Sequence, residues 1–414
     1  MRTAAHAPSA FAWYLTSSSS WMAAMSLQGF LLSWMLVGIL HEPADHVGFA
    51  RALVDAPSLV VLFVGGMLAD RMDGRTLLLR MHVLIALPCI AIALVAERFL
   101  SVSLVVAWGM TIAMLQSATD PARQAMLSQV TREHIQRTVT IMTIVTSLVG
   151  VGGVWIGGQL ERIGLARVLL LQAALFASGA IAVQRMPAMP PSASRAPLVT
   201  RGGYPRILSG LVETWRTPLV RNAIGLNFFS SLFNAGAYVV AVPFIVRDVY
   251  HGDADFFSRV MIVFTAGSIG SNVALLRFMP LRRPGRLFLH MQLTRIAILA
   301  ILYVRPSLPI FFATIFAWGV NMGVTSTLVR TTVQELAPID HRAQVLSVLL
   351  FSFLVTAPVS SLLLGAFIAD YDPLTGLLPG IAISAVIYVV GILWSGLWGY
   401  ESVREMSLTD LARS

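Results

Sequence analysis

The stretch GGMLADRMDGRTLLLR, residues Gly65–Arg80, lies between two long apolar runs and carries two acids and three arginines. Charge is scarce elsewhere: 12% of the 414 residues are charged, 57% are hydrophobic, and the mean hydropathy is +0.77. A soluble domain has about 25% charged residues. Because the apolar runs reach about 20 residues, the length of a helix that crosses a bilayer, the sequence predicts an all-α membrane protein with this stretch as one of its loops.

Twelve apolar runs are long enough to be transmembrane helices. They cover Phe11–Leu40, Gly48–Met67, Thr76–Ala96, Ser101–Ser117, Thr138–Gly158, Leu165–Val183, Val220–Val246, Phe256–Leu276, Leu287–Val304, Pro309–Leu328, Leu346–Phe367 and Thr375–Trp398. A segment rich in Pro, Gly, Ser and Arg separates the sixth run from the seventh. We therefore expect a six-helix bundle in residues 1–185, a cytoplasmic linker in 186–219, a second six-helix bundle in 220–400 and a cytoplasmic tail in 401–414.

The basic residues indicate how the chain is oriented in the membrane. All 29 are arginines, and they gather in one set of alternate loops that includes Arg71, Arg75 and Arg80. The opposite set of loops is richer in acids, such as Asp45 and Asp253. Cytoplasmic loops of membrane proteins collect basic residues, so both termini are predicted to be cytoplasmic. The net charge of +9 has the same origin and does not indicate a nucleic-acid site.

Residue types that enzymes and metal proteins need are absent or scattered. The lone cysteine, Cys89, excludes a disulfide, and the eight histidines have no metal-ligand spacing. No pair of nucleophile and base and no phosphate-binding loop is found. We expect neither an enzyme nor a bound cofactor or metal. His82 and His290, near the inner ends of their helices, are expected at the membrane interface.

The two halves of the chain repeat each other. ARQAMLSQVTREHIQRTV (Ala122–Val139) aligns with VRTTVQELAPIDHRAQVL (Val329–Leu346), so that Arg123 meets Arg330 at an offset of 330 − 123 = 207. Two parallel six-helix repeats form a known transporter plan. The run LRRPGR (Leu281–Arg286) is a degraded copy of the opening loop without its acid, and we interpret it as a topology signal.

The opening loop resembles the signature Gly-x-x-x-Asp-Arg-x-Gly-Arg of the major facilitator superfamily (MFS) of transporters. Gly66, Asp70 and Arg71 fit it, and Asp73 is an additional residue before the Gly-Arg pair. That spacing, with DPARQA (Asp120–Ala125), is similar to the transmembrane secretion effector branch, which includes the enterobactin exporter and macrolide efflux proteins. The resemblance covers nearly the whole chain and implies two six-helix bundles related by a pseudo-twofold axis.

For the opening loop, the resemblance implies a conformational latch on the cytoplasmic side. Asp70 faces the positive N-terminal end of a neighbouring helix, and Asp70, Arg71 and Asp120 form a charge relay. The remaining predicted latch residues are Gly66, Arg75 and Arg123. The alternative is an ordinary loop whose arginines only set the topology.

Helix 5 carries a second resemblance, in GVGGVWIGG (Gly150–Gly158). Gly153, Gly157 and Gly158 match the glycines that drug and metabolite antiporters of the superfamily have here, but Val154 replaces their proline. Glycines let two helix backbones approach closely. In the family the partner of this seam is helix 11.

The fold that the resemblance implies places helices 1, 4, 7 and 10 along the substrate path. Helices 1 and 7 each present two polar or aromatic residues seven apart, and helices 4 and 10 add one amide each. These residues are Trp21, Gln28, Asn227, Asn234, Gln116 and Asn321. Polar side chains at this depth line a cavity or bond to another helix, and both alternatives remain open. Because no acid lies at the midplane of these helices, the sequence favours neutral, zwitterionic or anionic cargo.

Asp55 and Arg51 lie four residues apart on one face of helix 2. They are either the proton-coupling group or a structural ion pair. Together these features predict a monomeric exporter of a bacterial inner membrane, driven by the proton gradient, whose partners are a small amphipathic substrate, such as a siderophore or antibiotic, and membrane lipids. The alternatives are a lysophospholipid or other lipid flippase and a non-transporting membrane sensor.

Overall fold

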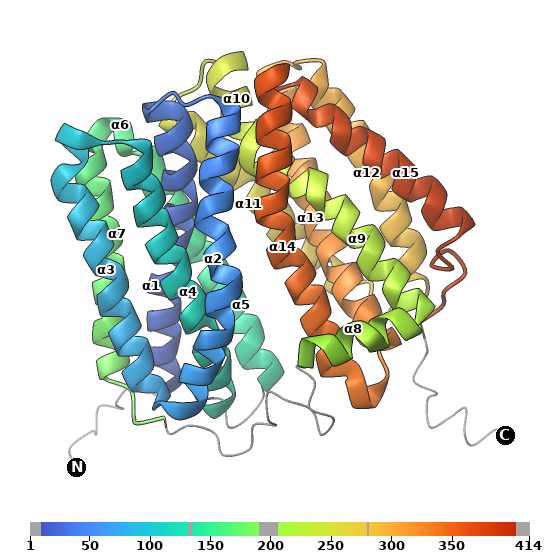
Figure 1. Ribbon diagram of the computed structural model, residues 1–414, viewed down its shortest axis with the longest axis horizontal. Helices are drawn as coiled ribbons and strands as arrows, with labels where there is room; N and C mark the ends of the chain where they lie inside the picture. The colour runs from blue at the N-terminus through green and yellow to red at the C-terminus, as the bar shows by residue number, and fades with distance from the viewer. Residues whose placement is uncertain (1–9, 131–134, 190–205, 280, 403–414) are drawn as a thin grey trace, which may run out of the picture. The chain divides into compact units, whose positions relative to one another are not determined.

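The computed structural model describes residues 10–130, 135–189, 206–279 and 281–402; a few side chains within these ranges, among them that of Asp70, lie outside the description. All regular structure in the described ranges is helical. Eleven of the described helices are long and apolar enough to cross a membrane. One more helix, α2 (Ala44–Arg71), is 28 residues long, about 42 Å at 1.5 Å per residue. Counting α2, the described helices match the predicted twelve spans, and the protein is a multi-pass, all-α membrane protein (Figure 1).

The helices of the first half coincide with the predicted apolar runs, but the fourth helix extends 130 − 117 = 13 residues beyond the end of its run. They are α1 (Ala10–Trp34) with a π-helical end at Met35–Ile39, α2 (Ala44–Arg71), α3 (Gly74–Phe99), α4 (Val102–Val130), α5 (Ile135–Gly158), α6 (Leu160–Ile163) and α7 (Leu165–Gln184).

The second half has the same succession of long helices. They are α8 (Arg206–Arg216), α9 (Pro218–Gly236), a π-helical turn at Ala237–Ala241, α10 (Val242–Phe244), a second π-helical turn at Ile245–Val249, α11 (Ala254–Leu276), α12 (Pro284–Tyr303), α13 (Leu308–Leu336), α14 (Arg342–Asp370) and α15 (Leu378–Leu393). Short 3-10 turns at Ile339–His341 and Thr375–Leu377 precede α14 and α15.

Contacts divide the chain into two compact units. The first contains Met1–Arg195 and Pro243–Ile262, and the second contains Ala196–Val242 and Val263–Ser414. The sequence assigns Pro243–Ile262 to the second bundle, yet this segment packs with the first unit.

Three contacts attach Pro243–Ile262 to the first unit. The Arg247 guanidinium donates to the carbonyl of Val37 at 2.8 Å, at the π-helical end of α1. The backbone N–H of Ala254 donates to the Glu161 carboxylate at 3.1 Å, which satisfies a free amide at the start of α11. The ring of Phe257 stacks on Trp34, with centroids 5.3 Å apart.

Each unit has its own apolar core. In the first, Leu77 and Leu78 of α3 pack with Met126 of α4 and Val183 of α7. In the second, residues of α9, α12, α13 and α14 pack together, among them Val220, Leu289, Val333 and Val345. Apolar side chains that helices bury against one another set the helix order within each unit.

Asp73, the additional residue of the opening loop, has a defined structural role. Its carboxylate accepts hydrogen bonds from Thr76 N at 2.9 Å and from Met189 N at 2.6 Å. The first bond caps the N-terminus of α3, and the second holds the chain that follows α7. The N–H of Gly74 donates to the carbonyl of Met189 at 2.8 Å, and Arg75 donates to the carbonyl of Gln184 at 2.5 Å. The loop therefore connects α3 to the end of α7.

The LRRPGR run makes the equivalent connection in the second unit. Arg286 donates to the carbonyl of Trp398 at 2.7 Å, and Arg283 donates to Glu401 at 2.7 Å. This hydrogen bond to Arg283 lowers the pKa of the Glu401 carboxyl. A Cβ on Gly285 would lie 2.2 Å from the carbonyl oxygen of Leu397, so the backbones touch. The run is more than a topology signal, because it connects α12 to the chain after α15.

Replacing Asp73 with Ala is expected to lower the melting temperature of the purified protein in detergent. The substitution removes the α3 cap, at a cost of about 1 kcal/mol, and leaves the Met189 amide unpaired, at about 1–3 kcal/mol. Asp73→Asn is the control, because its side-chain oxygen still caps Thr76. Equal melting temperatures for Asp73→Ala and wild type would show that the cap does not contribute to the stability of the protein.

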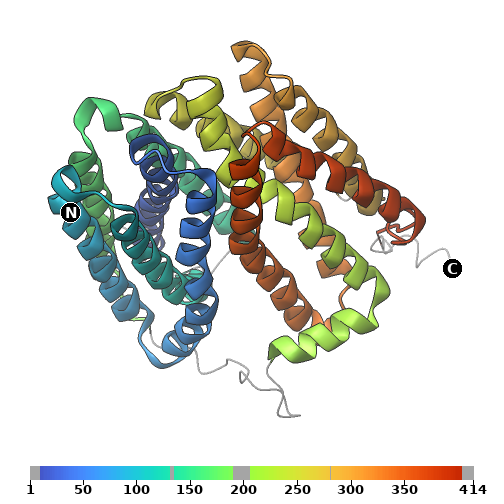
Figure 2. The ribbon, with the colours of Figure 1, turned by 45° about the horizontal axis from the view of Figure 1, so that its top comes forward.

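The predicted linker, 186–219, contains a helix. Residues 190–205 of it lie outside the described part, but α8 occupies Arg206–Arg216. Figures 1 and 2 show α8 (green) lying across the start of α9 and the start of α14. A Cβ on Gly210 would lie 2.5 Å from the carbonyl oxygen of Gln344 on α14, so α8 is packed against the second unit.

Candidate functional site

The interior of the second unit holds an arginine that the sequence interpretation missed. Arg295 lies in the middle of α12 and is 1% exposed. Its Nε and Nη2 atoms donate to Asn321 Oδ1 on α13 at 3.0 and 2.8 Å. Its Nη1 atom donates to Ser230 Oγ on α9 and, at 3.2 Å, to Gln292 Oε1 on its own helix. The guanidinium therefore joins three helices at once.

All of these partners are neutral. Helices α9, α12 and α15 contain no Asp or Glu, and the only acid of α13, Glu335, is 335 − 321 = 14 residues from Asn321. That distance is about 21 Å along a helix. The acid of α14 is its last residue, Asp370. Within the described residues, Arg295 is thus a fully buried cation without an acid beside it, which is costly in a membrane interior.

One of the predicted cavity residues, Asn321, binds this arginine directly. Asn321 accepts from it and donates to the carbonyl of Met291 at 2.7 Å and to Thr294 Oγ1 at 2.8 Å, so it bonds helices α12 and α13 together. Asn234 is buried and donates to the carbonyl of Ser230 at 2.7 Å. For Asn234 and Asn321 the structure shows hydrogen bonds inside the unit.

Two buried amide nitrogens on α9 and α12 have no hydrogen-bond partner among the described residues. They are Nδ2 of Asn227, whose side chain is 2% exposed, and Nε2 of Gln292. Asn227 lies three residues before Ser230, on the same face of α9. Gln292 already accepts from the Arg295 guanidinium, so an unused donor lies on a residue that contacts the positive charge, and that combination suits an anionic group.

The first unit has a different polar cluster, which contains Trp21. The Trp21 ring meets His82 edge-on at 4.9 Å and Phe176 at 5.4 Å, and the Arg123 guanidinium lies 4.8 Å above it. His82 is fully buried, and its Nδ1 lies 2.8 Å from the carbonyl of Leu78. The His82 ring is enclosed by α1, α3 and α7, so it faces the inside of the first unit, and its depth at the membrane interface stays a prediction.

Gln28 also faces the inside of the first unit. Its Oε1 accepts a hydrogen bond from Gln172 on α7 at 2.8 Å, and Gln172 donates as well to the carbonyl of Ala24. The two alternatives for Trp21 and Gln28 are that they line a cavity or that they contact another helix. Both residues contact another helix, because α3 and α7 pack on the face of α1 that they share. Gln116 lies half-buried on α4.

The predicted latch is described only in part. Gly66 and Asp70 lie within α2, but the surroundings of Gly66 and the side chain of Asp70 lie outside the described part of the structure. Arg71 is exposed at the end of α2, and Asp120 is a half-buried electrostatic neighbour of Arg123. The relay of Asp70, Arg71 and Asp120 stays a prediction. Arg75 donates to the carbonyl of Gln184 at the end of α7, and its part in the latch likewise stays a prediction.

The chain matches the Major Facilitator Superfamily model over residues 13–355. The chain belongs to the Major Facilitator Superfamily. Three solved structures, at sequence identities of 12% and 13%, show the same fold. A mutant of the nucleoside transporter NupG is 13% identical, with a TM-score of 0.77 over 92% of this chain and 98% of that one.

The second is a POT family transporter in complex with 5-aminolevulinic acid, 13% identical with a TM-score of 0.71 over 93% of this chain and 96% of that one. The third is a bacterial homologue of the human lysosomal transporter Spinster, inward-facing and unoccupied. It is 12% identical, with a TM-score of 0.65 over 95% of this chain and 97% of that one. No curated protein matches the chain.

For this superfamily member, the expected partner of the helix-5 glycines is the family's helix 11, which is α14 in this structure. The contacts described for these glycines are with other helices. A Cβ on Gly153 would lie 2.1 Å from the carbonyl oxygen of Ala23 on α1, and one on Gly157 would lie 2.4 Å from the Phe30 ring. A Cβ on Gly158 would lie 2.2 Å from Ser258 of α11. These glycines do allow close approach of helices, as predicted. Their described partners are α1 and α11 (Ala254–Leu276) rather than α14.

Arg51 and Asp55 form no direct ion pair. The Arg51 guanidinium is buried and donates to Ser33 Oγ and, at 3.4 Å, to the carbonyl of Gly29, both on α1. Asp55 is half-buried and remains an electrostatic neighbour of Arg51 without a hydrogen bond to it. The structural ion pair that was one of the two alternatives is therefore replaced by an α1–α2 hydrogen bond.

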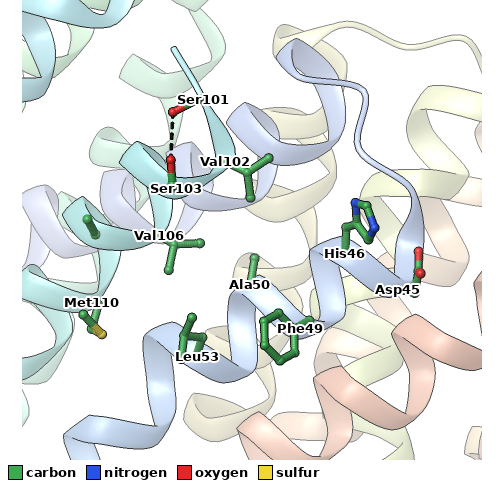
Figure 3. A pocket seen from close by; sticks show the side chains of 11 residues that line it. Asp45, His46, Phe49, Ala50, Leu53, Ser101, Val102, Ser103, Val106 and Met110 are labelled. Atoms are coloured by element: carbon green, nitrogen blue, oxygen red, sulfur yellow. Dashed lines mark hydrogen bonds between the residues drawn. The ribbon is translucent and has the colours of Figure 1, made fainter. Parts of the chain in front are cut away.

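A hollow of about 980 Å³ opens between α2 and α4 in the first unit (Figure 3). Phe49 and Leu53 of α2 and Val106 and Met110 of α4 line it, with Asp45 and His46 at one end. It is apolar, unlike the network around Arg295. Among the described residues, no group of His, Cys, Asp and Glu has the arrangement of a metal site.

Proposed function

We propose that this superfamily member exports small amphipathic molecules that carry an acidic group, in exchange for protons. It works as a monomer in a bacterial inner membrane, with both termini in the cytoplasm, and belongs to the exporter branch that its loop and DPARQA motifs resemble. The two six-helix bundles, 1–185 and 220–400, alternate access to the cargo. No cofactor takes part beyond the proton gradient.

One observation carries the choice of cargo: Arg295 is fully buried and has only neutral partners. Arginine stays charged at every physiological pH, so its charge is balanced by something that the described residues do not supply. A carboxylate, sulfonate or phosphate accepts two parallel hydrogen bonds from a guanidinium. The unused donor of Gln292, whose Oε1 accepts from Arg295, provides a further bond to the same anion.

The position of the arginine supports a transport role. Its partner Ser230 lies on α9, which corresponds to helix 7, one of the four helices along the substrate path in this fold. Asn321 and Thr325 lie on α13, which corresponds to helix 10, another of the four. In the proposed cycle, this cluster opens towards the substrate path and the cargo anion replaces neutral partners of the guanidinium.

Uptake into inverted membrane vesicles that contain the protein tests this function. The probes are an amphipathic aromatic sulfonate, its neutral sulfonamide and a quaternary ammonium of the same ring system, because the two ions do not cross the bilayer unaided. We expect uptake of the sulfonate into inverted vesicles, and loss of that uptake when an uncoupler removes the proton gradient. Transport of the ammonium alone would contradict the anionic cargo, and uptake that ignores the uncoupler would contradict the antiport.

Asp55 is the proposed proton carrier. It is half-buried, and a carboxylate without a direct ion pair takes up a proton more readily than a paired one. Asp55→Asn is expected to reduce uptake driven by the proton gradient by about tenfold or more. Exchange of labelled for unlabelled cargo, which needs no net proton movement, is expected to continue. The control is Asp45→Asn, at an exposed position of the same helix; equal loss of both activities in Asp55→Asn would assign Asp55 to the cargo site or the structure.

A further inference from the structure

We propose that the second unit binds an anionic phospholipid in a groove between α9 and α15, with the lipid phosphate on Arg221. The groove is a hollow of about 420 Å³ at the start of α9 and the end of α15. Its lining residues are Trp215, Arg221, Asn222, Gly225, Leu226, Phe229, Ile383, Val386, Ile387, Val390, Trp394 and Ser395. This site is independent of the proposed cargo site, since it shares no residue with it.

The polar end of the groove has the composition of a membrane–water interface. Trp215 of α8 and Trp394 after α15 are 69% and 74% exposed, and tryptophans favour the headgroup level of a bilayer. The Arg221 guanidinium lies 5.3 Å from the Trp215 ring and, among the described residues, pairs with no acid. Asn222 closes this end by donating to the carbonyl of Ser395 at 3.0 Å.

The rest of the groove is apolar and has the length of one leaflet. From Arg221 to Phe229 is eight residues of α9, about 12 Å, and from Trp394 back to Ile383 is eleven residues, about 16 Å. Half of a bilayer core is about 15 Å thick. Phe229 and Val386 are exposed on this surface, with Gly225 leaving space between them and the interface. An acyl chain fits along these side chains.

The charge selects the headgroup. Arg221 is half-buried at the polar end, and Arg216 is exposed nearby at the end of α8. Two arginines attract a lipid with a net negative charge, since each basic residue near an anionic headgroup contributes about a fivefold gain in affinity. We therefore assign phosphatidylglycerol, rather than a zwitterionic lipid, as the type of occupant.

Native mass spectrometry of the full chain in detergent tests the site. The chain is titrated with phosphatidylglycerol and with phosphatidylcholine of identical acyl chains, and bound lipids are counted. We expect one phosphatidylglycerol to be retained more tightly than phosphatidylcholine. Arg221→Gln is expected to weaken it about fivefold, while Arg277→Gln, at an exposed arginine after α11, is expected to have no effect.

A second variant blocks the groove without touching charge. A Cβ on Gly225 meets no atom within 4 Å and the residue lines the hollow, so Gly225→Leu places its side chain in the hollow. Its matched control is Gly270→Leu, because Gly270 is equally open but lies on α11. We expect Gly225→Leu alone to lose the lipid. Equal retention of both lipids by wild type, or unchanged phosphatidylglycerol binding in Gly225→Leu, would overturn the proposal.

Discussion

Arg295→Gln is expected to abolish transport of anionic cargo while leaving the protein folded. Removing the charged partner of a buried hydrogen-bonded ion pair costs about 2–5 kcal/mol of binding, which is about 30-fold or more in affinity. Glutamine is uncharged but still reaches hydrogen-bonding partners. Uptake of the aromatic sulfonate and its binding to the purified protein are the measurements.

The melting temperature separates this role from a structural one. Within the described residues Arg295 has no acid beside it, so removing its charge removes a burial cost rather than an ion pair. We expect Arg295→Gln to melt within a few degrees of wild type, because relief of the burial cost opposes the loss of the hydrogen bonds to Asn321 and Gln292. A variant that transports normally, or that loses transport only because it unfolds, would contradict the assignment.

Two further variants sharpen the result. Arg295→Lys keeps the charge but loses the planar fork of donors, so it is expected to retain weak binding and to fall between wild type and Arg295→Gln. Arg259→Gln is the control, because Arg259 is an exposed arginine of α11 that already pairs with Asp255. It is expected to transport cargo as wild type does.

Gly153→Ala is expected to destabilise the first unit, whereas Gly152→Ala is not. A Cβ at Gly153 would lie 2.1 Å from a backbone oxygen of α1, and backbone yields less than a side chain does. A Cβ at Gly152 meets no atom within 4 Å. Overpacking of this kind costs about 1–3 kcal/mol, whereas alanine in an open helix position stabilises by about 0.5–1 kcal/mol.

The two neighbouring glycines therefore control for each other in helix propensity and membrane depth. Melting temperatures in detergent are the measurement, with Gly153→Ala below wild type and Gly152→Ala at or above it. If both variants melt alike, α1 and α5 are not in backbone contact at this point.

The helices could be predicted because their signal is local. Each long apolar run meets the same requirement, that backbone groups in lipid be satisfied within the segment, so runs of about 20 residues become helices wherever they lie. The additional Asp73 could also have been interpreted locally, since an acid three residues before Thr76 is a common N-cap arrangement. Its second bond, to Met189, joins residues 116 positions apart and needs the tertiary fold.

The site residues were harder to assign because spacing reveals a face but not its neighbour. Trp21 and Gln28 do share a face of α1, as their seven-residue separation predicts, but that face meets α3 and α7. Asn227 and Asn234 share a face of α9 in the same way. The sequence contains one signal for Arg295, an arginine in the middle of an apolar run. The orientation rule considers only the arginines in loops, so it gave no reason to single out this residue.

By itself, the amino-acid sequence determined that this protein is a multi-pass helical membrane protein with repeated halves, because hydropathy, loop charge and internal repetition are properties of the chain alone. Only the tertiary structure decided which helices the glycines of α5 approach, that Pro243–Ile262 packs with the first unit, and that Arg295 is buried among neutral partners. Burial, pairing and close approach depend on residues distant in the chain, and the packing of the helices brings those residues together.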